Sequence, residues 1–262
     1  MRRHEANPAH ADRARVVCAD DVSARRRIVA IGGGGFLFDD AALLQERYLV
    51  SLCRRARPHA LYLGTAAGDG ERAQLKFMKA FSSLGCGADT LPFFPYEMRR
   101  DYTAAVRQAD LVYVGGGNTP AMLAVWREFG FEQALREAYE AGTVFAGISA
   151  GANCWFEHYV TDSVPGGGVR QGLGWLPGTF CPHLDSEGWR QPMLVATSGP
   201  AAGAGENVAV LFENERWAEA VSSAAPSTPV CCRRRVGDEP LESVEPRRLR
   251  VDAPAQGGSN ER

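Results

Sequence analysis

The stretch Val144-Phe145-Ala146-Gly147-Ile148-Ser149-Ala150-Gly151 joins an apolar run to a turn of small residues. A run without polar positions is typical of a strand in a sheet that is covered on both faces. Gly147 to Gly151 form a G-x-S-x-G pattern, in which a strand turns sharply into a helix and presents a serine hydroxyl. The stretch therefore predicts Ser149 as a nucleophile, the alternative being a serine that caps a helix.

Other apolar runs end in glycine and alternate with helical patterns. The runs are 28–31, 61–63, 111–114 and, more weakly, 90–94, and the helical patterns are 40–54, 71–84 and 119–141, with a break at Gly130. This alternation predicts βαβ units, and we expect an α/β three-layer sandwich with a mostly parallel central sheet. Short β-like runs at 207–212, 229–236 and 241–250 are expected to add strands to the same domain.

Length and composition favour one α/β domain over residues 27–250. Residues 1–26 show no apolar period and are expected to form a flexible arm, and 251–262 a disordered tail. Twenty-nine basic and 31 acidic residues give a formal net charge of −2, which argues against a nucleic-acid partner. No apolar run reaches the roughly 20 residues of a membrane helix, and the first 26 residues lack a signal-peptide core, so we expect a cytoplasmic protein without a membrane partner.

A serine nucleophile needs a base, and the best candidate is His183, in the apolar loop Phe180-Cys181-Pro182-His183-Leu184-Asp185. Asp162, Asp185 and Glu206 compete for the carboxylate that would orient the imidazole. The amide of Ala150 and an amide of the turn Gly115-Gly116-Gly117-Asn118-Thr119 could hold an oxyanion, although such a turn could also bind a phosphate. The seven scattered cysteines contain no C-x-x-C pair, so neither a metal site nor a disulfide framework is indicated.

Three motifs taken together resemble a known family. Val114-Gly115-Gly116-Gly117-Asn118-Thr119, Gly147-Ile148-Ser149-Ala150-Gly151-Ala152 and Pro182-His183 look like those of the serine peptidases of the dipeptidase E (aspartyl dipeptidase) and cyanophycinase group. The segments Cys154-Trp155-Phe156, Thr161-Asp162-Ser163 and Cys181-Pro182-His183 are similar to the bacterial dipeptidase-E-like branch. The resemblance runs from about Ile28 to Leu249 and implies a class I glutamine amidotransferase-like fold.

By position, the resemblance implies Ser149 as nucleophile, His183 as base and Asp162 as the acid. It implies Gly116 and Ala150 as oxyanion donors, with Gly115 as an alternative to Gly116. We also expect Asn118 and Glu206 to contact the substrate.

The activity expected is that of a serine peptidase, a dipeptidase or exopeptidase that cleaves short peptides through an acyl-enzyme without metal or organic cofactor. A preference for an N-terminal aspartate would follow the family. The chain is expected to act as a monomer or homodimer. The alternatives are an esterase of the α/β-hydrolase fold and a catalytically silent module that binds a small ligand. The short Ser149-to-His183 separation and the missing His-Gly-Gly-Gly motif weaken the esterase.

Overall fold

The computed structural model describes residues 25–38, 42–94, 101–223, 230–237 and 239–250. Apart from Arg25 and Arg26, the predicted arm 1–26 lies outside the described residues, as does the predicted tail 251–262. Arg26 is fixed by Glu215, since Nε and Nη2 of the arginine each donate to a carboxylate oxygen at 2.8 Å. None of the helices in the described ranges has the length and apolar character needed to cross a bilayer.

An eight-stranded sheet forms the centre of the molecule, in the order β14-β11-β10-β1-β5-β4-β2-β3. Its five strands from β3 to β1 are parallel, while β10 lies antiparallel to both β1 and β11. The strands are β1 (Arg27–Ile31), β2 (His59–Leu63), β3 (Gly87–Thr90), β4 (Leu111–Val114), β5 (Val144–Ile148), β10 (Val208–Glu213), β11 (Arg216–Ser222) and β14 (Arg247–Arg248). The parallel strands confirm the predicted α/β class.

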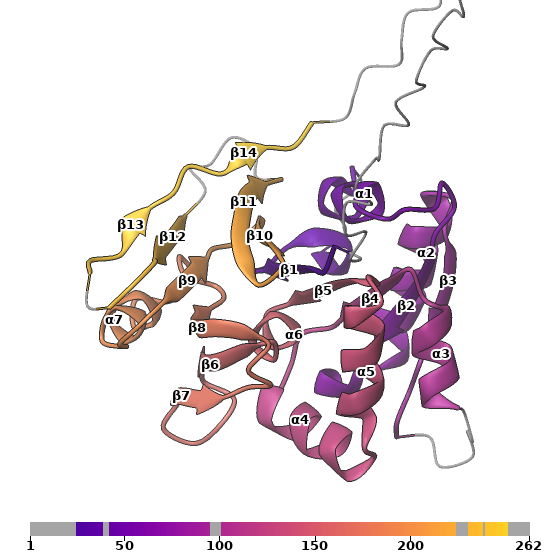
Figure 1. Cartoon of the computed structure of the whole chain (residues 1–262), viewed down its shortest axis with the longest axis horizontal. Helices are drawn as coiled ribbons and strands as arrows, with labels where there is room; N and C mark the ends of the chain where they lie inside the picture. The colour runs from indigo at the N-terminus through magenta and orange to yellow at the C-terminus, as the bar shows by residue number, and fades with distance from the viewer. Residues whose placement is uncertain (1–24, 39–41, 95–100, 224–229, 238, 251–262) are drawn as a thin grey trace, which may run out of the picture.

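Helices cover both faces of this sheet, which explains why its strands are apolar throughout (Figure 1). Side chains from α1 and α2 pack on the Tyr62 and Tyr113 face, while those from α3, α4 and α5 pack on the Leu63 and Val112 face. The helices are α1 (Leu44–Ser51), α2 (Glu71–Ser83), α3 (Tyr102–Gln108), α4 (Thr119–Glu128) and α5 (Phe131–Glu140), with 3₁₀ turns η1 (Gly35–Phe38) and η2 (Thr65–Ala67). The predicted break at Gly130 separates α4 from α5, because this glycine adopts a left-handed φ of 60°.

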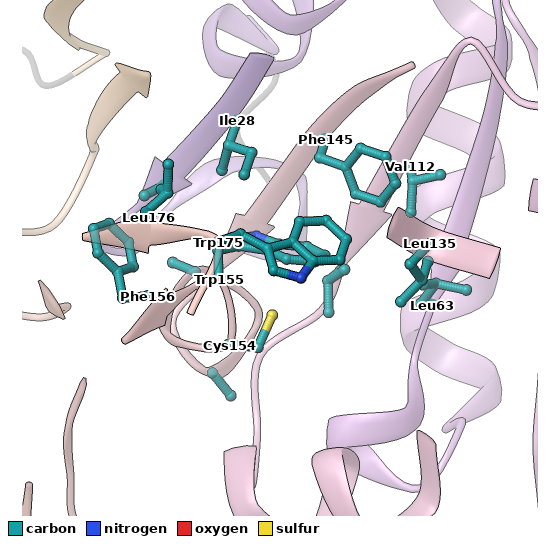
Figure 2. Packing of buried hydrophobic residues seen from close by; sticks show 14 of the residues in the cluster. Ile28, Leu63, Val112, Leu135, Phe145, Cys154, Trp155, Phe156, Trp175 and Leu176 are labelled. Atoms are coloured by element: carbon teal, nitrogen blue, oxygen red, sulfur yellow. The ribbon is translucent and has the colours of Figure 1, made fainter. Parts of the chain in front are cut away.

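Aromatic side chains fill the core next to β5 and β1. Trp155 and Trp175 lie with ring centroids 5.0 Å apart, and Phe145 of β5 meets both edge-on (Figure 2). Burial of such large rings is a main source of folding free energy. The segment after Ser149 is thereby packed onto the central sheet.

The chain after Ser149 forms a second sheet and also returns to the first, which β10, β11 and β14 extend. The order of the second sheet is β13-β12-β9-β8-β6-β7, with β6, β8 and β9 parallel. The elements are α6 (Ala150–Asn153), β6 (Phe156–Thr161), β7 (Gly168–Gln171), β8 (Leu176–Cys181), α7 (Arg190–Val195), β9 (Ala201–Ala204), β12 (Cys231–Arg234) and β13 (Glu242–Ser243). The sequence pattern did not predict α3 or β6 to β9. It placed a strand at 90–94, a few residues later than β3, which ends at Thr90 before Leu91 and Pro92.

The two sheets approach each other at glycine residues. A Cβ on Gly32, just after β1, would lie 2.2 Å from the carbonyl oxygen of Gly205, just after β9. Gly33 and Glu206 form an isolated parallel bridge, and the amide of Asn207 donates to the carbonyl of Gly33 at 3.0 Å. The carboxyl ends of β1 and β9 are therefore fixed beside each other.

We expect Gly32→Ala to lower the free energy of unfolding by about 1–3 kcal/mol, because the new methyl group would overlap the backbone of the second sheet. Gly188→Ala is the matched control, since a Cβ there meets nothing within 4 Å, and its effect should stay within about 0.5 kcal/mol. Urea unfolding of the two purified variants checks this. Equal stabilities would show that the two sheets are not held together at Gly32.

Candidate active site

Ser149 occupies a strained turn between β5 and α6. Its φ of 54° and ψ of −112° are unusual for a residue with a side chain and cost on the order of 1–3 kcal/mol. Two glycines make the turn possible. A Cβ on Gly147 would lie 2.0 Å from the carbonyl oxygen of Gly151, and one on Gly151 would lie 2.2 Å from that of Val114. The turn thus has the geometry that the G-x-S-x-G pattern predicts.

The carboxyl ends of β1 and β4 flank the serine. The amide of Ser149 donates to the carbonyl of Ile31, the last residue of β1, at 3.0 Å. On the β4 side, a Cβ on Gly116 would lie 3.3 Å from Cβ and 3.8 Å from Oγ of Ser149. Gly116 therefore lies directly beside the hydroxyl, where a backbone amide can reach a reacting carbonyl.

The two candidate glycine amides differ in their availability. The amide of Gly115 donates to the carbonyl of Leu63 at 2.9 Å and is used by the sheet. Within the described ranges, no hydrogen bond uses the amides of Gly116 or Ala150. These two amides are therefore free to stabilise negative charge on a substrate oxygen.

Asn118 has a structural position in the same turn. Its Oδ1 accepts from the amide of Ala121 and caps α4, while its Nδ2 donates to the carbonyl of Ser163 at 3.0 Å. Both ends of the side-chain amide are thus engaged within the protein. Asn118 thereby links the Gly116 turn to the segment that follows β6. These bonds are structural, and they use the same side-chain groups that were predicted to contact the substrate.

His183 and Glu206 lie together beyond the ends of β8 and β9. Nδ1 of His183 is 2.5 Å from Oε1 of Glu206, and both side chains are part-buried. The hydrogen bond with His183 is the largest cause that lowers the pKa of Glu206, although partial burial acts in the opposite direction. An ionised Glu206 accepts the proton on Nδ1, which leaves Nε2 of the imidazole as the basic nitrogen.

Glu206 is held from three sides. A Cβ on Gly33 would lie 1.9 Å from its Oε2, so the carboxylate rests on the glycine that follows β1. The hydroxyl of Ser186 donates to Oε1 at 3.0 Å, and Oδ1 of Asp185 accepts from the Glu206 amide at 2.9 Å. Asp185 thus fixes the backbone of Glu206. Among the residues that the structure describes, no hydrogen bond or ion pair joins Asp185 to the imidazole of His183.

The structure places Asp162 with an arginine and not with the histidine. Oδ2 of Asp162 is 3.2 Å from Nη2 of Arg190, a side chain that is only 5% exposed. Arg190 also pairs with Glu187 and lies over the ring of Trp189. Among the described residues no hydrogen bond or ion pair joins Asp162 to His183. The carboxylate beside His183 belongs to Glu206, which the sequence analysis named both as a candidate for the acid of the triad and as a substrate contact.

The sequence analysis did not identify Glu206 as the partner of His183 or Arg190 as the partner of Asp162, for different reasons. Glu206 follows the short run Ala201–Ala204, whose small residues gave little indication of a strand. Had β9 been recognised, Glu206 would have been expected at the carboxyl edge, where ligands bind in parallel sheets. Arg190 offered no such signal, since its burial depends on how α7 packs against β6, β8 and β9. Within the described ranges no group of three or more metal-ligating side chains comes together.

Comparison with known proteins identifies the family of the chain. Residues 28–219 match the model of peptidase family S51. An uncharacterised peptidase, YgaJ, of Bacillus subtilis (strain 168) is 39% identical over 203 residues, which cover 76% of this chain and 88% of that protein.

Two solved structures show the same fold. A peptidase from an acI-B1 actinobacterium superposes with a TM-score of 0.64 at 18% identity, covering 86% of this chain and 96% of that one. A putative peptidase E protein from Listeria monocytogenes EGD-e gives a TM-score of 0.55 at 16% identity, covering 74% and 98%. With the family model spanning most of the chain, this protein belongs to peptidase family S51 and is a serine peptidase.

Proposed function

We propose that this peptidase cleaves short peptides as a dipeptidase or exopeptidase, with Ser149, His183 and Glu206 as its catalytic triad. The observation that carries the proposal is that the strained Ser149 and the His183–Glu206 pair both lie where the chain after β1 meets the chain after β9. Ile31 holds the Ser149 amide, and Gly33, two residues further on, supports the Glu206 carboxylate. The restriction to short peptides rests on the resemblance to the dipeptidase E branch.

The chemistry follows from the hydrogen bonds. Oγ of Ser149 attacks the scissile carbonyl carbon, and Nε2 of His183 takes the hydroxyl proton. Glu206 stabilises the imidazolium through Nδ1. The amides of Gly116 and Ala150 donate to the oxyanion, and the imidazolium then protonates the leaving amine. Water, deprotonated by the same imidazole, hydrolyses the acyl-enzyme and releases the acid product.

We propose that the preference for an N-terminal aspartate is weak in this protein. An acidic side chain would need a cation at the site. Arg190 is the arginine whose charge acts on Glu206, and it already pairs with Asp162 and Glu187. Neutral first residues should therefore be accepted.

Ser149→Ala should lower the rate of peptide cleavage by about 10⁴-fold or more, because the substitution removes the attacking oxygen. A fluorophosphonate probe should label the wild-type chain at Ser149 and leave the variant unlabelled. The melting temperature, measured in parallel, controls for folding. Labelling at another residue, or normal turnover in the folded variant, would contradict the assignment and point to a different nucleophile, while a wild-type chain with neither labelling nor turnover would favour the silent module.

Glu206→Gln should lower kcat by about 10⁴-fold, since an amide in place of the carboxylate can hold the imidazole in the wrong tautomer. Asp162→Asn is the matched control. Its amide oxygen can still accept from Arg190, so kcat should fall by less than about tenfold. A crippled Asp162→Asn beside an active Glu206→Gln would restore Asp162 as the acid of the triad.

A panel of Ala-Xaa, Leu-Xaa and Asp-Xaa dipeptides, with the N-acetylated forms and a p-nitrophenyl ester as references, tests the substrate class. We expect free dipeptides to be cleaved, and kcat/KM for Asp-Xaa to lie within about tenfold of that for Ala-Xaa. Cleavage of the ester alone would point to the esterase. A preference of 100-fold or more for Asp-Xaa would show that Arg190 exchanges its partner carboxylates for the substrate.

A further inference from the structure

A second concave site lies at the opposite end of the second sheet from the catalytic side chains. The parallel strands β6, β8 and β9 carry Asp162, His183 and Glu206 beyond their carboxyl ends. The amino ends of the same strands, together with the β10–β11 hairpin and β12, line a cavity of about 420 Å³. That volume lies in the range of small-molecule sites, about 300–1,000 Å³.

The floor of this cavity is aromatic. Phe156 stacks on Phe180 at a centroid distance of 4.8 Å and meets the edge of Phe212, which in turn meets Trp217. Phe156, Phe212 and Trp217 line the cavity directly, together with two prolines at the starts of β8 and β9, Pro177 and Pro200. Phe156 and Phe212 are only 1% and 6% exposed, so the apolar surface that a ligand can reach is formed mainly by Trp217 and the two prolines above these rings.

The rim is basic and its charge is only partly neutralised. Arg216, Arg233, Arg234 and Arg235 line it, and one carboxylate, Glu242, pairs with both Arg233 and Arg235. The buried Arg234 donates to the backbone carbonyls of Val195, Thr197 and Gly199 and to the Thr197 hydroxyl, without a carboxylate partner.

The remaining charges leave the rim positive. The guanidinium of Arg216 has neither a hydrogen bond nor an ion pair in the described part of the chain, while its backbone belongs to the β10–β11 ladder. The lining carboxylate Glu215 is already bound by Arg26. The guanidinium of Arg233 also lies 5.4 Å from the centroid of the Trp217 ring, so a cation stands directly over the aromatic floor.

We propose that this cavity is a second ligand site, which binds a small amphipathic anion: a carboxylate or sulfonate carried on an aromatic or aliphatic body. The apolar body packs on Trp217, Pro177 and Pro200, and the anionic group pairs with Arg216 at the rim. Charge complementarity selects this class, because a neutral apolar ligand would leave the arginine charge unused and an anion without a body would leave this apolar lining in water. The proposal is independent of the triad assignment.

Titration with 8-anilinonaphthalene-1-sulfonate, followed by its fluorescence, tests the site. N-phenyl-1-naphthylamine, which has the same rings without the sulfonate, is the matched probe. We expect one saturable sulfonate site in the wild type, and at least about tenfold weaker binding of the neutral probe. Arg216→Ala should weaken sulfonate binding about tenfold, while Arg72→Ala, which removes an exposed arginine of α2, should leave it unchanged.

Two further variants separate this site from the catalytic one. Ser149→Ala should bind the sulfonate like the wild type, and Trp217→Phe should reduce energy transfer from tryptophan to the bound probe. Non-saturable binding, equal affinity for the neutral probe, or an Arg216→Ala variant that binds normally would overturn the proposal. So would displacement of the probe by a fluorophosphonate at Ser149. Loss of binding as a dimer forms with rising protein concentration would assign the cavity to a second copy of the chain.

Discussion

The contact between the backbone after β1 and the backbone after β9 is the constraint on which the site depends. Only residues without side chains fit there, since a Cβ on Gly32 would overlap the carbonyl of Gly205 and one on Gly33 would overlap Glu206. The central sheet carries Ser149, and the second sheet carries His183 and Glu206, so neither sheet contains all three members of the proposed triad. The distance between the two sheets, and hence between Ser149 and His183, is set where the chain after β1 packs against the chain after β9.

Local strain at the site is balanced by the rest of the fold. Ser149 and His183 both adopt left-handed φ values, 54° and 53°, which residues with a Cβ seldom do. Each lies between segments that cannot relax. Ser149 follows a fully buried strand and precedes the helix that leads into Trp155. The amide of Leu184, next to His183, donates to the carbonyl of Ala204 at 3.2 Å. Burial of Phe145, Trp155 and Trp175 in the aromatic core contributes favourable folding free energy, which offsets the cost of this strain.

Periodicity predicted the central sheet well, because its strands are buried on both faces and read as continuous apolar runs. The helical patterns at 71–84 and 119–141 were recognised because each presents an apolar stripe to that sheet. In the second sheet, the predicted runs 229–236 and 241–250 contain β12 and β13, whereas β6 to β9 were missed. Polar residues interrupt β6, Pro177 and Gly178 interrupt β8, and β9 consists of alanine and glycine.

The same distinction holds for the site. Ser149 and the glycines around it form a local pattern, and the sequence alone identifies them. The partner of His183 depends on which strand ends lie together in space, and it was the resemblance to the dipeptidase E branch that favoured Asp162. The ion pair with Arg190 determines where the Asp162 carboxylate lies, but no local sequence pattern predicts that this arginine is buried.

The antiparallel pairing of β1 with β10 has a consequence for synthesis. Arg27 pairs with Glu213, 186 residues further along the chain, so β1 can gain its antiparallel neighbour only after all the residues between them have been made. At roughly 5–20 residues per second, Glu206 leaves the ribosome several seconds after Ser149. During that interval the nascent chain carries Ser149 without Glu206, on a sheet in which β10 is still missing beside β1. The proposed triad is thus complete only after the chain has been made as far as Glu206, shortly before β10 joins the sheet.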